Sequence, residues 1–434
     1  MAACAKCMAD RVVVALNLRE DRARLDGDDA VSLLEGVLVL DVASYIAGPA
    51  ATTVLADFGA DVIKIEPLEG DPYRLLGRNA GPHNPFWVQD ARNKRSLAID
   101  LKHAQGRAVF AQLVQRADVL VTNYRDAVLE RLQMRWEDLQ PINARLIYAS
   151  LTGFGRDGPD ADQSGFDVTA WWARSGLMDF VRRSGGLPTG SAPGMGDHAT
   201  AMSMVAAIMM GLYRRDRTGT GSHVTTSLLA NGVWAHAMMT SVALCGMPVG
   251  SKDVPVQPGN AVSFSYETRD GRWLHVNMMN EPKEWDGLLA ALDLQALADD
   301  ARFARIPERR TNAPALAAIL ASRFRALDRS DVEQRLRVHG VTHGFAMQLH
   351  EVDRDVQLKA ADVLTPVAEQ RDGLTHLVNS PIWIEGLDKM PPRYAPRIGE
   401  HSRSILGELG YQAAAIESMI ADGIVREPVA GELN

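Results

Sequence analysis

The sequence is poor in cysteine, with only Cys4, Cys7 and Cys245 among its 434 residues. Three thiols are too few for a disulfide framework and suit a reducing compartment, which predicts a cytoplasmic protein. Cys4 and Cys7 have the CxxC spacing of a metal-binding pair, but no second pair and no nearby histidine accompany them. We therefore expect no metal site.

Long apolar runs are also missing. No segment approaches the roughly 18 apolar residues that a membrane-spanning helix needs, so we expect no membrane partner. Within residues 1–33 the only apolar run, Val12–Leu16, is short and is followed by acidic residues, unlike a signal or transit peptide. We interpret this stretch as an irregular N-terminal extension. The formal net charge of −8 disfavours nucleic acid as a partner, because both would be anionic.

The motifs of several common enzyme classes are absent. The sequence has no GxGxxG after its first strand and no GxxxxGK[ST], so the phosphate loops of dinucleotide-binding and P-loop proteins are missing. It also has no HExxH and no GxSxG, which removes the usual support for a zinc or serine hydrolase. His339 and His343 have i, i+4 spacing without the carboxylate of HExxH, which is typical of a polar helix end.

A regular alternation of short apolar strands and helices begins at Gly36. The predicted strands cover 37–43, 61–66, 96–99, 118–123 and 145–150, and the predicted helices cover 50–58, 104–116 and 127–132. Such alternation predicts an α/β fold whose large domain is a doubly wound parallel sheet with helices on both faces.

Beyond about Gly250 the pattern changes to two strands, at 262–268 and 273–277, followed by helices at 285–292, 314–326 and 331–339. This order predicts a smaller α+β domain, as the chain length also suggests. The expected division is an extension at 1–33, a large domain from 34–235 and 379–434, a small domain at 250–350, and linkers at 236–249 and 351–378.

The candidates for chemistry are two carboxylates in the glycine-rich stretch 151–200, Asp167 and Asp197. Asp197 directly precedes a predicted helix at 199–215 that is apolar nearly all round and therefore expected to be buried. A purely structural reading makes Asp197 an N-cap. A functional reading has the helix N-terminus keep the carboxylate ionised while the flanking glycines let a substrate approach.

At this point the sequence resembles the class III CoA-transferases, a family that includes the formyl-CoA, carnitine and bile-acid CoA-transferases and the α-methylacyl-CoA racemases. The resemblance runs from about Leu34 to Asp286 and continues more weakly toward the C-terminus. Its motifs are Leu40–Ala43 with Ala47–Pro49, Gly59–Glu66, Asn93–Ser96 with Asp100–Lys102, Ala117–Val121, Leu151–Gly155 with Gly158–Pro159, Gly196–Asp197, and Thr218–Gly221. The resemblance implies an interlocked homodimer with the active site at the interface.

The resemblance also implies roles for individual residues. Asp197, after Gly196, would attack an acyl-CoA thioester and pass through an aspartyl anhydride and an aspartyl-CoA thioester before a carboxylic acid acceptor leaves as the new thioester. Coenzyme A is thus part of the substrate and no cofactor is bound permanently. Contacts to CoA carried over by position fall on Lys102, Asn123, Tyr124 and Arg131 and on the backbone of Ser44, Tyr45 and Ile46. Without the resemblance, Lys102 and Arg131 would be read as solvated helix residues.

Departures from the family pattern favour the transferase branch. Phe166 stands where the racemases have a histidine, and an apolar ring cannot shuttle a proton. Asp167 would then orient the site, and Glu281 matches an active-site glutamate of the racemases. The polyglycine loop of the formyl-CoA branch is absent between Val254 and Ser265, and Ile46 replaces its glutamine. We expect a larger, apolar acceptor acid, with Trp171, Trp172, Met178 and Phe180 either lining an acyl pocket or packing in the core.

Two alternatives stay open. One is an α-methylacyl-CoA racemase or acyl-CoA isomerase that uses Asp197 as a base. The other is a CoA-binding scaffold without either activity.

Overall fold

The computed structural model describes residues 32–77, 84–182, 185–249, 258–371 and 373–429. Cys4, Cys7 and nearly all of the expected N-terminal extension lie outside the described residues. The described residues within 32–182, 188–249 and 359–429 belong to a large compact unit, and those within 185–187 and 258–358 belong to a small one. Each unit has its own core.

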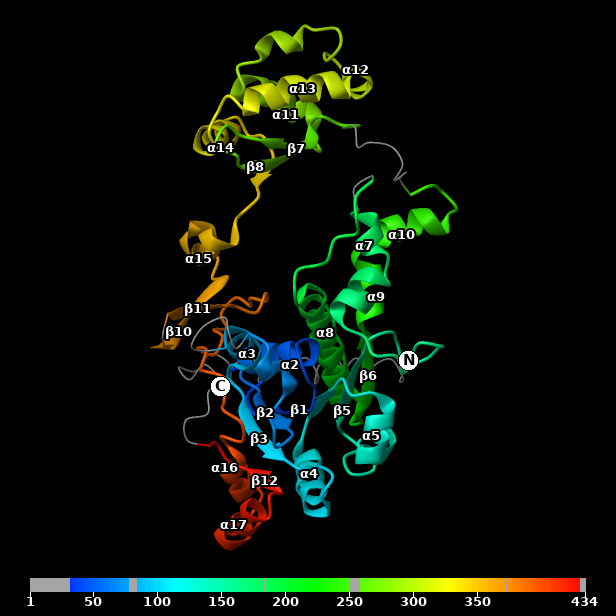
Figure 1. The fold of residues 1–434 in the computed structure, drawn as a ribbon, viewed down its shortest axis with the longest axis vertical. Helices are drawn as coiled ribbons and strands as arrows, with labels where there is room; N and C mark the ends of the chain where they lie inside the picture. The colour runs from blue at the N-terminus through cyan, green and yellow to red at the C-terminus, as the bar shows by residue number, and fades with distance from the viewer. Residues whose placement is uncertain (1–31, 78–83, 183–184, 250–257, 372, 430–434) are drawn as a thin grey trace, which may run out of the picture. The chain divides into compact units, whose positions relative to one another are not determined.

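The large unit is built on a seven-stranded sheet (Figure 1). In spatial order its strands are β12 (Val425–Arg426), β3 (Arg95–Ile99), β2 (Asp61–Glu66), β1 (Leu38–Asp41), β4 (Val119–Thr122), β5 (Ile147–Thr152) and β6 (Ser222–Ser227). β1 to β6 run parallel, and β12 pairs antiparallel with β3. The strand order reverses between β1 and β4. In open α/β sheets the loops that leave such neighbouring strands form the ligand-binding crevice.

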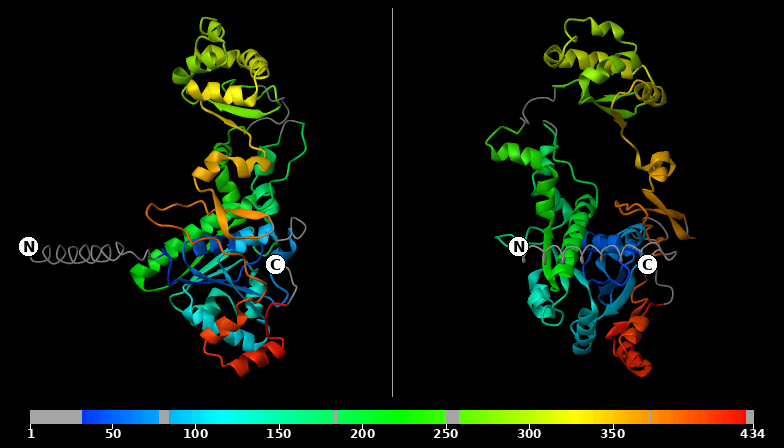
Figure 2. Two further views of the ribbon diagram at one scale, coloured as in Figure 1. Left: turned by 90° about the vertical axis from the view of Figure 1, so that its left-hand side faces the viewer. Right: turned by 180° about the vertical axis from the view of Figure 1, so that it is seen from behind.

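Helices cover both faces of this sheet. Val39 of β1 packs in one core with α2 (Ala47–Asp57), α8 (Met195–Thr218) and α9 (Leu228–Ala235). Leu40, the next residue, packs on the other face in a core that holds α4 (Ala104–Arg116), α5 (Asp126–Leu132), α16 (Ser402–Glu408) and α17 (Ala413–Ala421). Figure 2 shows α16 and α17 in red beside α4 in cyan. Burial on both faces explains why the strands read as continuous apolar runs.

Regular elements also occur in the ranges expected to be linkers. Residues 236–249 contain α10 (Ala237–Leu244), and 351–378 contain η4 (Leu349–Arg354) in part, α15 (Val356–Ala360) and the antiparallel strands β10 (Leu364–Arg371) and β11 (Leu374–Val378). Val367 and Leu377 of this hairpin pack with Tyr73 and Trp87. These elements have too little periodicity of their own to be recognised in the sequence. The buried apolar residues of the hairpin pack against residues that are distant in the sequence.

The small unit consists of a three-stranded antiparallel sheet and helices packed on it. Its strands are β7 (Ser263–Glu267), β8 (Trp273–Asn277) and β9 (His343–Phe345), and its helices include α11 (Glu281–Ala291), α12 (Ile306–Thr311), α13 (Ala313–Phe324) and α14 (Arg329–Val338). The core is formed by Tyr266, Leu274 and Val276 of the sheet with Leu288 and Phe324 of the helices. The predicted α/β class, with a large parallel sheet and a smaller antiparallel one, is confirmed. Within the described ranges no helix is long and apolar enough to cross a membrane.

Candidate active site

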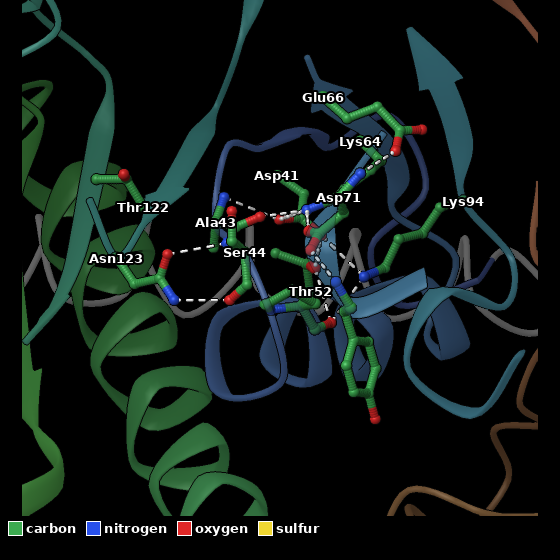
Figure 3. A network of polar contacts seen from close by, with 12 residues as sticks. Asp41, Ala43, Ser44, Thr52, Lys64, Glu66, Asp71, Lys94, Thr122 and Asn123 are labelled. Atoms are coloured by element: carbon green, nitrogen blue, oxygen red, sulfur yellow. Dashed lines mark hydrogen bonds and ion pairs between the residues drawn. The ribbon is translucent and has the colours of Figure 1, made fainter. Parts of the chain in front are cut away.

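The loop that leaves β1 is held by a network of buried charges (Figure 3). Lys94 Nζ lies 2.8 Å from Asp41 Oδ2, and Lys64 Nζ lies 2.7 Å from Asp71 Oδ2. Lys64 also donates to the carbonyl of Ala43, and Asp71 Oδ1 accepts from the backbone N–H of Tyr45 at 3.2 Å. The network thus holds the loop at Ala43 and at Tyr45.

Tyr45 itself has a φ of +63°, a left-handed conformation that is uncommon for a residue with a bulky side chain. The contact from Asp71 to its N–H helps to hold this backbone in place. Since strain of this kind persists only where the surroundings enforce it, the loop 42–46 is a preorganised element of the site.

Asn123, directly after β4, joins this loop to the next one across the strand-order reversal. Its Oδ1 accepts from the N–H of Ser44 at 2.9 Å and its Nδ2 donates to the carbonyl of Ser44 at 2.7 Å. The amide mimics a strand partner for Ser44 where β1 and β4 have ended. The structure therefore brings together three of the predicted CoA contacts, Ser44, Tyr45 and Asn123, and gives Asn123 a role in positioning the loop.

Two pockets flank these loops. Lys102 and Tyr124 line a pocket of about 190 Å³ together with Ile99, Pro67 and Leu132. Arg131, the remaining predicted contact, is exposed on α5 and does not line this pocket, although its neighbour Leu132 does.

The larger pocket, of about 460 Å³, is lined by Tyr45, Asn123, Tyr124 and the segment Ser164–Phe166, among others. Phe166 is 50% exposed, and its ring meets that of Tyr45 edge to face with centroids 5.6 Å apart. The residue that replaces the racemase histidine thus forms an aromatic wall.

The same pocket contains residues that no sequence motif singles out. Ser150 Oγ lies 2.8 Å from His223 Nε2, and the His223 ring stands edge-on to that of Tyr148. Burial, with a smaller contribution from Arg156, lowers the pKa of His223 to about 4, so its imidazole is neutral at pH 7. These residues lie on adjacent strands, a pairing that spacing along the chain does not indicate.

Asp197 is not an N-cap, contrary to the structural reading of the sequence. Helix α8 begins at Met195, earlier than predicted, with Gly194 as its N-cap at a φ of +73°. Asp197 is therefore the third residue of the first turn. The helix is buried on one face only: Met204 is inaccessible, whereas Met210 is 71% exposed, so the expectation of burial all round is also wrong.

Gly196 allows the first turn of α8 to pack on the segment that carries Asp167. A Cβ at Gly196 would lie 2.6 Å from Cγ of Trp171, closer than side chains approach one another. Trp171 belongs to η2 (Asp167–Ala173), a π-helix in the glycine-rich stretch 151–200. The adjacent glycine thus lets Asp197 come close to Asp167.

The buried carboxylate of Asp167 acts on Asp197. Asp167 is 7% exposed; its Oδ1 accepts from the N–H of Val168 at 2.7 Å, and its Oδ2 has no hydrogen-bond partner among the described residues. Burial first, and then the charge of Asp167, raise the pKa of Asp197 to about 7. At that pKa about half of the Asp197 carboxyl groups are ionised at pH 7.

His198 follows Asp197 and contacts a residue from a different element. Its Nε2 lies 3.0 Å from Oδ1 of Asp90 on α3 (Pro85–Ala91), and its Nδ1 lies 3.0 Å from the carbonyl of Gly194. Asp90 is 108 residues away in the sequence, so this pair has no local signal.

Three further predicted residues, Trp171, Trp172 and Glu281, make structural contacts. Trp171 and Trp172 are buried and stacked within the core between the sheet and α8, which supports the core-packing reading of these two. In the small unit, Glu281 is buried and paired with Arg309 at 3.0 Å and with Arg310. Both of its oxygens are thereby occupied.

Comparison with known proteins identifies the class. Residues 34–402 match the model of CoA-transferase family III. This is most of the chain, so the protein belongs to that family, as its motifs indicated.

Individual relatives support the assignment to this family. The (R)-2-hydroxy-4-methylpentanoate CoA-transferase of Clostridioides difficile is 28% identical over 403 residues, covering 91% of this chain and 100% of that protein. The succinate–glutarate CoA-transferase of Agrobacterium fabrum is 31% identical, covering 87% and 95%. A solved CaiB/BaiF family protein from Brucella suis superposes with a TM-score of 0.77 at 29% identity, covering 87% of this chain and 99% of that one.

Proposed function

We propose that the protein transfers CoA from an acyl-CoA thioester to a carboxylic acid, with Asp197 as the nucleophile. The observation that carries this proposal is the placement of Asp197 in the first turn of α8, where the charge of Asp167 acts on it and the preceding glycine lets the turn pack on Trp171. The names of the relatives, which are CoA-transferases for several acids, support the same reaction.

The reaction proceeds in balanced steps. A carboxylate oxygen of Asp197 attacks the thioester carbonyl, and the C–S bond breaks to give a mixed anhydride and CoA thiolate. The thiolate attacks the aspartyl carbonyl, which releases the donor acid and leaves an aspartyl-CoA thioester. The acceptor carboxylate repeats the sequence in reverse and departs as the new thioester. CoA held at the loops after β1 and β4 would keep the thiolate near the anhydride.

The acceptor we infer is a larger, apolar acid. The edge-to-face pair of Phe166 and Tyr45 provides an apolar wall to the pocket of about 460 Å³. Phe166→Ala should therefore raise KM more for phenyllactate than for glutarate as acceptor. Phe86→Ala, an exposed aromatic on α3, serves as the matched control.

Covalent trapping tests the proposed function. Protein incubated with acyl-CoA thioesters and hydroxylamine should yield a hydroxamate at Asp197, located by mass spectrometry of the peptide. Asp197→Asn should abolish both the hydroxamate and transfer. Asp216→Asn, an exposed aspartate on the same helix, should leave them intact. Transfer by Asp197→Asn would refute the assignment.

A racemase or isomerase is the second candidate, since a pKa of about 7 suits Asp197 as a general base. It predicts that solvent deuterium enters the α-carbon of an acyl-CoA without any acceptor acid. Failure to observe this exchange eliminates it.

We also propose a homodimer. Large apolar side chains are exposed on α8, α9 and α10: Met210, Tyr213, Trp234, Met238 and Leu244, of which Met238 is 85% exposed. A surface of this kind is unusual on a monomer, and a second copy of the chain is the occupant that the family resemblance supplies.

A further inference from the structure

The imidazole of His198 is placed between two hydrogen-bond acceptors. Nδ1 lies 3.0 Å from the carbonyl oxygen of Gly194, and Nε2 lies 3.0 Å from Oδ1 of Asp90. A carbonyl cannot donate, and neither can an ionised carboxylate. A neutral imidazole has only one N–H, so both contacts are hydrogen bonds only if the ring carries two protons and a positive charge.

Asp90 is fixed as the partner of this ring. It is 2% exposed on α3, and its Oδ2 accepts from the hydroxyl of Tyr73 at 2.8 Å. Its own carbonyl accepts from Thr53 Oγ1 at 2.6 Å and from Lys94 Nζ at 2.8 Å. The carboxylate therefore has a donor on each oxygen, and the ring of His198 is one of the two.

The position of this charge matters because it adjoins two carboxylates. The ionisable groups that act on Asp197 are Asp167 from η2, Asp90 from α3 and His198 from its own helix. The two aspartates raise the pKa of Asp197, and His198 is the group among them that lowers it. The hydrogen bond to Asp90 in turn raises the pKa of His198 to about 9, with Asp197 contributing in the same direction.

We propose that Asp90 and His198 form a fixed ion pair whose imidazolium is the counter-charge that keeps Asp197 available as an anion. His198 is thus a positioning residue that acts through Asp197, and Asp90 acts through His198. The inference rests on the proposed function only in taking Asp197 as the nucleophile. The ion pair itself does not depend on which reaction is catalysed.

The experiment reads both charges directly in the full-length protein, without substrate. Protein labelled with ¹⁵N-histidine and with ¹³Cγ-aspartate is titrated by NMR, and the two signals are assigned from their loss in His198→Gln and Asp197→Asn. In the wild type, both ring nitrogens of His198 should be protonated at pH 7.5. In Asp90→Asn the ring should be neutral at that pH. His198→Gln should raise the pKa of Asp197 by about one unit or more.

His376→Gln, a change at an exposed histidine on β11, is the control and should leave the Asp197 titration unchanged. Asp90→Asn and His198→Gln remove the charge from opposite ends of the pair, so the protonation of His198 in Asp90→Asn still tests the ion pair if His198→Gln does not fold. A neutral His198 in the wild type at pH 7.5 overturns the proposal. So does an Asp197 titration that stays unmoved in folded His198→Gln, where only the imidazolium charge is removed.

The pH dependence of activity tests the counter-charge role independently of NMR. The acid limb of the pH profile of kcat/KM should move to higher pH in His198→Gln, whereas a merely structural defect would lower the profile without moving it. An unmoved limb in an active variant contradicts the counter-charge role. If the wild type shows no CoA transfer at all, the proposed function fails while the NMR result still decides the ion pair.

Discussion

The Asp197 carboxylate is costly to the fold when it is ionised. Burial and Asp167 raise its pKa to about 7, whereas an aspartate in an unfolded chain titrates near about 3.9. Between these values the folded state binds the proton more tightly than the unfolded state. Stability therefore falls as the pH rises from about 4 to about 7, and the loss is complete above that range.

Asp197→Asn removes this titration. The variant should be more stable than the wild type at pH 8 by about 1–3 kcal/mol, with the difference shrinking toward pH 4. Urea unfolding at the two pH values measures it, and Asp216→Asn should show no such pH-dependent gain. A variant that is both inactive and less stable at pH 8 would contradict this account of Asp197.

Gly196 is required by packing. Gly196→Ala would place a methyl group against the ring of Trp171, and we expect a loss of about 1–3 kcal/mol in the free energy of unfolding. Gly407→Ala is the matched control, because Gly407 lies within helix α16 with nothing near its absent Cβ. The control should be neutral or slightly stabilising. Equal destabilisation of the two variants would show that steric contact with Trp171 is not the cause.

Among single residues, those that form a motif with their neighbours in the chain could be predicted from the sequence. Gly196 and Asp197 are adjacent and form a motif, so they were identifiable. The partners of that motif, Trp171 beside Gly196 and Asp90 beside His198, come from other elements and follow only from the packing of α8 on η2 and α3. The raised pKa of Asp197 depends on this packing and could not be predicted.

At the scale of elements, the contact between the loops after β1 and β4 should control substrate binding. Asn123→Ala removes both hydrogen bonds to Ser44, and we expect about a tenfold increase in KM for acyl-CoA, corresponding to about 1.4 kcal/mol. Steady-state kinetics at saturating acceptor measures this change.

Asn143→Ala is the control for that prediction. Asn143 also makes two side-chain hydrogen bonds to backbone, with the carbonyls of Val114 and Ala117, but at a different place in the large unit. It should lose comparable stability without a change in KM. A KM that rises equally in both variants would mean that general loosening, rather than the loop after β1, limits binding.

Elements with strong periodicity were predicted closely and those without it were not. β2 at Asp61–Glu66 and α4 at Ala104–Arg116 have the predicted bounds, since apolar runs and turns mark both ends. The start of α8 was predicted too late, because the pattern Gly194-Met-Gly196 reads as a loop. The π-helix at Asp167–Ala173 has no recognisable spacing of its own and is held by the tryptophans that it buries.

At the scale of the whole molecule, the alternation of strands and helices predicted a parallel sheet but not the order of its strands. The pairing of β1 with both β2 and β4, and of β12 with β3, joins segments that are far apart in sequence. Only this order places Ser44 beside Asn123, so their contact could not be predicted from strand patterns alone.

The interlocked form that the family resemblance implies makes a prediction that an ordinary dimer does not. Linked protomers cannot separate without unfolding, so sedimentation should give twice the 47.3 kDa chain mass even at nanomolar protein. Tagged and untagged dimers mixed under native conditions should form no mixed species over many hours, but should form them after joint unfolding and refolding. Trp234→Glu, at an exposed apolar residue of α9, should reduce the yield of dimer on refolding, because a charge in the proposed interface must be desolvated on assembly. Val338→Glu, at an exposed apolar residue of the small unit, should not. Native exchange of subunits would exclude the interlocked form, and a stable folded monomer would exclude the dimer itself.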